Sequence, residues 1–169
     1  MLCQQEYFAC FTRMAARIAC TIAPMLESLL AFFHIAAFVV WVLFAASLAA
    51  LCRAEWLNEA ALRRLSRLDA LLWGAAVLVL VSGLLRVYLG KFGAGFYWAN
   101  WLLHLKLTLF AVVLVLQALV TWRLSRWRAA LPQAGGARMV RVLLLAAMSI
   151  MVLLPLAGAF MARGFGAIG

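Results

Sequence analysis

Charged residues are scarce in this chain: Asp, Glu, Lys and Arg together make up 12% of its 169 residues, whereas 69% are hydrophobic. The mean hydropathy is +1.09, which leaves too little polar surface to cover a water-soluble globule. The phosphate loop, the nucleophile elbow and the zinc-binding helix pattern of soluble enzymes are also missing. These absences exclude a soluble enzyme and predict an integral membrane protein.

Segments of alternating polarity, the mark of a membrane β-barrel, are missing as well. The apolar residues instead form blocks close to the roughly 20 residues that an α-helix needs to cross a bilayer. The predicted fold class is therefore all-α, an integral membrane four-helix bundle. The four predicted spans cover about residues 26–51, 70–89, 101–122 and 140–161.

Acidic residues are few, and the formal net charge is +10. Arginines gather in the loops after the first and third predicted spans, and basic loops prefer the cytoplasmic side. Both termini are therefore predicted on the outer, periplasmic side of the membrane. The excess positive charge predicts contact with anionic membrane lipid and no nucleic-acid partner.

The chain has four cysteines but no CxxC pair and no zinc-like spacing, so no chemistry is assigned to them. Three of them lie in residues 1–24, which we expect to be an N-terminal extension. Two explanations stay open for this segment: a start placed too early, or a weakly structured outer segment. Residues 25–169 are expected to form the four-span domain.

The predicted loops differ in character. Residues 52–69 form a helix-compatible run at the headgroup surface, with Asn58 as a candidate helix cap. Residues 90–98, rich in glycine and aromatic side chains, predict a tight outer turn that could cover a site. Residues 132–136 predict a flexible break, and Pro155 predicts a kink in the last span.

Four ionisable side chains lie within or just inside the apolar blocks: His34, Arg86, His104 and Lys106. A charge at membrane depth is costly, so each is a candidate functional residue. Structural alternatives stay open for each residue. A lone histidine can be satisfied by a backbone carbonyl, and arginine or lysine can extend to the headgroups.

Helical phase limits which of these groups can meet. His104 and Lys106 are two residues apart, so they point about 200° away from each other on one helix. One arrangement directs His104 toward His34 and Lys106 toward a neighbouring helix, a subunit or an acidic group. In that arrangement the two histidines would be axial ligands of haem b, and Arg86 and Lys106 would pair with its propionates.

From Met25 to the end, the chain resembles a family of bacterial predicted membrane proteins of unknown function. The resemblance covers roughly the last 145 residues. It lies in an ordered set of short motifs: Met25-Leu26-Glu27, Phe33-His34, Leu65-Ser66-Arg67-Leu68-Asp69, Gly83-Leu84-Leu85-Arg86-Val87, Lys91, Phe96-Tyr97, Asn100, His104-Leu105-Lys106, Arg126-Trp127-Arg128 and Met161-Ala162-Arg163-Gly164.

More distantly, Phe33-His34-Ile35 and the segment 101–107 are similar to HemJ-type protoporphyrinogen oxidases and CopD-type copper-resistance proteins. The HemJ-type resemblance implies haem b, with His34 and His104 as candidate metal ligands and Lys106 as a functional partner. The chain departs from that pattern because it has four spans and no histidine after His104.

Three functions therefore remain open. The first is a multi-pass protein of the bacterial inner membrane that binds haem b for electron transfer or a porphyrin-linked oxidation. The second is a copper-handling protein that uses His34, His104 and methionines. The third is a structural or assembly subunit without a cofactor. A redox partner or a homo-oligomer fits the first function, and enzymatic activity stays undecided.

Overall fold

The computed structural model describes residues 2–53, 57–90, 93–127, 134–163 and 165–166. Within these ranges all regular structure is helical, which confirms the predicted all-α fold class. Four helices are long and apolar enough to cross a membrane. The helices are α1 (Leu2–Leu51), α2 (Glu59–Leu89), α3 (Gly93–Ala99), α4 (Trp101–Trp127) and α5 (Ala134–Ala162).

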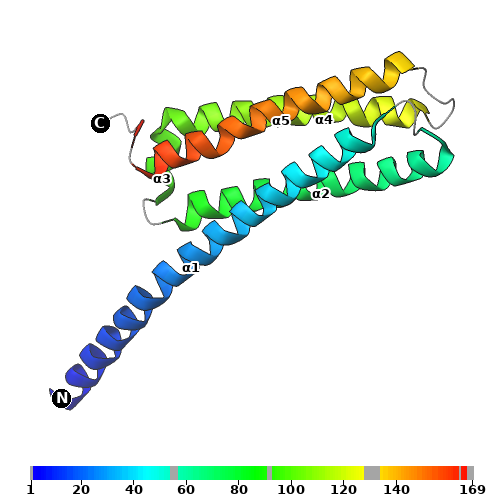
Figure 1. Ribbon diagram of the computed structural model, residues 1–169. Helices are drawn as coiled ribbons and strands as arrows, with labels where there is room; N and C mark the ends of the chain where they lie inside the picture. The colour runs from blue at the N-terminus through cyan, green and yellow to red at the C-terminus, as the bar shows by residue number, and fades with distance from the viewer. Residues whose placement is uncertain (1, 54–56, 91–92, 128–133, 164, 167–169) are drawn as a thin grey trace.

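The four long helices form one bundle (Figure 1). α1 packs against α2 and α5, and α4 packs against α5 and α2. The short helix α3 contacts α2 and α4 at the end of the bundle where α5 ends (Figure 1). At the opposite end, α1 and α4 end and α2 and α5 begin (Figure 1). These two ends are called the α3 end and the loop end below.

The N-terminal part of α1 projects beyond the bundle at the α3 end (Figure 1). Residues 1–24 are expected to be an N-terminal extension, and that assignment stays a prediction. The backbone continues as one helix from Leu2 through Pro24 into the first span, whose apolar part covers Pro24–Leu51. Alanine and other good helix formers in this segment favour such continuity, which a hydropathy boundary does not detect.

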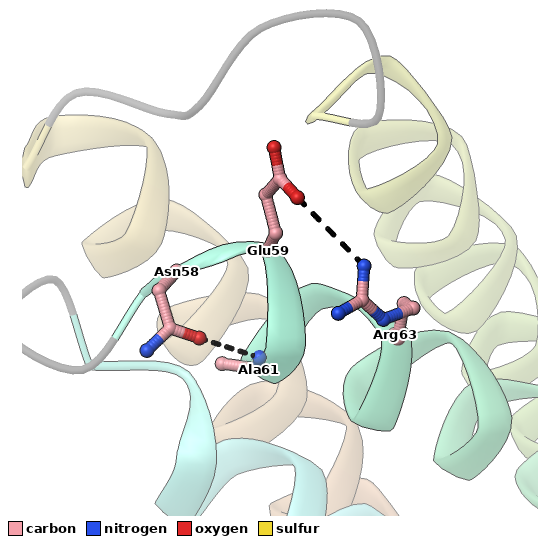
Figure 2. Close-up of polar contacts among 4 residues, drawn as sticks. All are labelled: Asn58, Glu59, Ala61 and Arg63. Atoms are coloured by element: carbon pink, nitrogen blue, oxygen red, sulfur yellow. Dashed lines mark hydrogen bonds and ion pairs between the residues drawn. The ribbon is translucent and has the colours of Figure 1, made fainter.

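α2 begins well before the apolar block that marks its span. Asn58 caps it, since its side-chain oxygen accepts a 2.8 Å hydrogen bond from the backbone N–H of Ala61 (Figure 2). Arg63 lies 3.8 Å from Glu59 on the exposed side of the first turns. The predicted cap is confirmed. Residues 59–69, expected at the headgroup surface, are the first turns of the spanning helix.

Two other predicted loops are partly helical. The expected turn at residues 90–98 contains α3, which begins at Gly93 with a φ of 75°. Of the predicted break at residues 132–136, the first two residues lie outside the described part of the chain, and Ala134–Gly136 belong to α5. α5 continues through Pro155, and the kink expected there stays a prediction.

The apolar core is concentrated in the half of the bundle nearer the loop end. On α1 it begins at Trp41, on α2 it ends at Val79, and on α4 it begins at Phe110. Toward the α3 end, large apolar side chains of α1 such as Phe32, Phe33 and Ile35 are exposed instead. Their exposure fits contact with lipid. The half nearer the α3 end therefore contains less of the tightly packed core, and three of the four predicted site residues point into it.

Candidate functional site

His34 lies on α1, beyond the end of the apolar core, and its ring contacts α2. Its Nδ1 is 2.8 Å from the Oγ of Ser82. The Ser82 hydroxyl is itself directed at backbone carbonyls, 2.6 Å from that of Leu78 and 3.2 Å from that of Val79. Because a hydroxyl has one proton and uses it there, Ser82 accepts from His34, whose Nδ1 carries the hydrogen. Nε2 of His34 is then the nitrogen with a free lone pair.

Gly83 allows the ring to lie directly against the α2 backbone. A Cβ atom at this position would be 3.2 Å from Cε1 of His34 and 3.7 Å from its Nδ1. Contacts this short require the neighbour to move by a few tenths of an ångström. The adjacent pair of Ser82 and Gly83 therefore fixes both the proton position and the location of the imidazole.

Lys106 enters the same region from α4. Its Nζ reaches α5, where a Cβ added at Gly158 would lie 3.4 Å from it. The charges of Lys106 and of Arg86, which is on α2, both act on the His34 ring, and Arg86 also acts on Lys106. Three nitrogen-bearing groups from three helices thus lie near enough to act on one another electrostatically, and a glycine of the fourth long helix makes room for one of them. We call His34, Ser82, Arg86 and Lys106 the outer site, after the outer side that the loop charges predict for the α3 end.

The outer site carries more positive charge than its described surroundings compensate. Neither Arg86 nor Lys106 forms an ion pair with a carboxylate in the described part of the chain. Glu27 is near enough to affect Tyr97 on α3: burial raises the pKa of this phenol, Arg86 lowers it, and Glu27 raises it. Cations held at membrane depth without a counter-ion favour binding of an anionic group.

His104 has a different environment. It is exposed on α4, and its Nε2 donates a 3.0 Å hydrogen bond to the backbone carbonyl of Trp98, next to the Trp98 ring. Lys106 takes the inward position, so His104 points to the other side of the same helix. The structure therefore brings His34, Arg86 and Lys106 together and leaves His104 outside the group. No cluster of three or more His, Cys, Asp or Glu side chains suited to a metal occurs in the described residues.

A second polar group is not predicted by the sequence pattern. Nε1 of Trp41 donates to Oε1 of Gln117 at 3.2 Å, and Nε1 of Trp73 donates to Oγ1 of Thr121 at 2.9 Å. Thr121 also lies 3.0 Å from Oδ1 of Asp69. The arginines that precede Asp69 favour a loop at this position, although a carboxylate so close to an apolar block is a usable signal of a buried site.

The fold and the outer site together define a multi-pass membrane protein with a polar group inside its helical bundle. The chain belongs to DUF2214, a family of predicted membrane proteins, whose pattern matches residues 26–166. The search of curated proteins gave no match. None of the solved structures matches the chain either.

Proposed function

We propose that this protein binds haem b at the outer site, in the inner membrane of a bacterium, and serves electron transfer or a porphyrin-linked oxidation. By the preference of basic loops for the cytoplasm, the loop end would be cytoplasmic and both termini outside, so the haem would lie near the outer face. When bound, haem would supply one-electron redox chemistry. The residues of the outer site would hold and orient it.

The tautomer of His34 is the observation that carries this proposal. A histidine that ligates a metal through one nitrogen commonly donates the hydrogen of the other nitrogen to a neighbouring acceptor. The Ser82 hydroxyl, held by the carbonyls of α2, accepts that hydrogen at 2.8 Å. Nε2 of His34 is thereby left as a nitrogen ligand for iron on an orientated ring.

The charges of Arg86 and Lys106 suit the propionate groups of haem b. Haem b carries two propionate carboxylates, and Arg86 and Lys106 both lack a described carboxylate partner. Charge-assisted hydrogen bonds to propionates would compensate both cations in a setting of low polarity. The exposed apolar side chains of this half of α1 would border the porphyrin or the lipid.

His104 was expected to be the second axial ligand. Its Nε2 donates to the Trp98 carbonyl, and its ring is exposed, so ligation by this nitrogen requires that hydrogen bond to break. We therefore propose that His34 would hold the iron through its Nε2 in this conformation. Loss of the haem spectrum in His104→Ala would instead support the two-histidine form.

The test is a reduced-minus-oxidised visible spectrum of detergent-purified protein expressed with ample haem. We expect a Soret band and an α band that His34→Ala abolishes. Ser82→Ala should lower haem affinity about tenfold, because it removes the partner that orients the ligand. Ser149→Ala is the matched control, since this hydroxyl also bonds a carbonyl one turn back but is exposed on α5.

The alternatives give different results in the same preparation. A featureless spectrum with copper in elemental analysis would replace haem by copper handling through His34 or His104. A featureless spectrum without metal would support a structural or assembly role. If His34→Ala kept the full spectrum, the ligand assignment would be wrong.

A further inference from the structure

The second polar group contains a buried amide with unused donors, and it is distinct from the outer site. Gln117 is 2% exposed on α4, and Trp41, which bonds to it, is fully buried on α1. On α4, the buried residues Phe110 and Val113 separate Gln117 from Lys106. The chemistry of the Gln117 amide is therefore independent of the proposed haem site.

The orientation of the Gln117 amide is fixed by chemistry. Nε1 of Trp41 can only donate, so the amide atom 3.2 Å from it must be the carbonyl oxygen. Exchanging the oxygen and nitrogen positions would place two donors against each other. Nε2 therefore points away from Trp41, and it has no acceptor within the described part of the chain.

An unpaired amide nitrogen in an apolar interior is strongly unfavourable. The near-complete burial of Gln117 leaves no room for a lipid or a second protein chain to contact it. The missing acceptor must therefore be small enough to reside inside the bundle. A water molecule is such an acceptor, and buried waters typically bond otherwise unsatisfied polar groups.

Polar groups continue along the bundle from Gln117. Thr121 lies one turn further along α4, with its Oγ1 3.1 Å from the backbone carbonyl of Gln117. The same hydroxyl is 3.0 Å from Oδ1 of Asp69, a residue of α2 that is 7% exposed. The Gln117 amide therefore belongs to a polar region inside the bundle, where a buried water is favoured over an empty apolar cavity.

We propose that the bundle holds an ordered water molecule at Nε2 of Gln117, beside the Thr121–Asp69 pair. This water would be a solvent-exchangeable partner of the Gln117 amide in the half of the bundle nearer the loop end.

Nuclear magnetic resonance tests the site directly, with water itself as the probe. Changing the other glutamines leaves Gln117 as the sole source of a side-chain amide signal after selective glutamine ¹⁵N labelling. The changes are Gln4→Glu, Gln5→Glu and Gln133→Glu. We expect a water cross peak at the Gln117 amide protons, with the sign of a long-lived bound water. Absence of that cross peak would show a dry amide and overturn the proposal.

Discussion

At the scale of single residues, the outer site depends on how closely the His34 ring approaches α2. A Cβ at Gly83 would be 3.2 Å from the ring, whereas a Cβ at Gly74, on the same helix, would meet nothing within 4 Å. Substituting each glycine by alanine therefore distinguishes two effects. One is displacement of the His34 ring, expected only at Gly83, and the other is the general stabilisation of a helix by alanine, expected at both positions.

We therefore expect Gly83→Ala and Gly74→Ala to have different effects. Gly74→Ala should stabilise α2 by up to about 1 kcal/mol, because alanine is the better helix former. Gly83→Ala should lose that gain and weaken haemin binding several-fold, because the ring must move. Melting temperature and haemin titration of both variants measure this. Equal melting temperatures and equal haemin affinities in the two variants would contradict a role for the close contact between the His34 ring and α2.

Cys52, which follows the last residue of α1, allows a prediction about pH. Burial raises the pKa of its thiol from 9.0 to about 11, against an opposing effect of Arg141. The folded protein then holds the thiol proton more tightly than the unfolded chain does. This contribution to stability is complete below pH 9 and is lost as the pH rises from about 9 to about 11.

Cys52 should also resist alkylation at pH 8, since the thiolate is the reactive species and the side chain is buried. Iodoacetamide labelling, followed by mass spectrometry, measures this in a variant in which Cys3, Cys10 and Cys20 are changed to serine. We expect slow labelling of the folded protein and fast labelling after denaturation. Comparable rates in both states would contradict the buried, protonated thiol.

At the scale of helices and loops, the start of α2 is capped by one side-chain hydrogen bond. The Asn58 side chain satisfies the backbone N–H of Ala61 at 2.8 Å (Figure 2). Asn58→Ala should cost about 1 kcal/mol of unfolding free energy, as is typical of a lost N-cap. Glu59→Gln is the control, because it removes only the 3.8 Å exposed pair with Arg63 and should cost a few tenths of a kcal/mol. A larger effect at Glu59 than at Asn58, in reversible unfolding in mixed detergent, would refute this ranking.

Hydropathy predicted the apolar part of every span but not where the helices begin and end. For example, the sequence predicted a loop over residues 52–69, because arginines at positions 63, 64 and 67 lower the local hydropathy up to Asp69. A helix can continue into the headgroup region with charged side chains on its surface, so composition does not mark its first residue. α3 is short and has no buried residue, so its helical form depends on contacts with α2 and α4 that a local pattern does not contain.

The same limit applies to the outer site. The sequence predicted that His104 and Lys106 point in opposite directions, and this follows from helix geometry alone. Which of the two faces the bundle depends on the rotation of α4 against α5, where Gly158 gives Lys106 space. The bond from His34 to Ser82 depends likewise on the register between α1 and α2. The spacing of residues along a single helix cannot predict either the rotation of α4 or the register between α1 and α2.

At the scale of the whole molecule, packing and polarity divide the bundle into two regions. The half nearer the loop end holds most of the apolar core and the Gln117 cluster, whereas the half nearer the α3 end holds the outer site. On α4, the buried residues Phe110 and Val113 lie between them. We therefore expect a change at Gln117 to leave haem binding unaffected, and a change at His34 to leave the Gln117 water in place.

Binding of haem iron by Nε2 of His34 is tested most directly by a titration of haem-free protein with haemin. The titration is followed at the Soret band for wild type, His34→Ala and His104→Ala. We predict saturation at one haemin per chain, a loss of affinity of at least about tenfold in His34→Ala, and nearly unchanged binding in His104→Ala. Identical titration curves for wild type and His34→Ala, or no saturable binding by the wild type, would contradict ligation by His34.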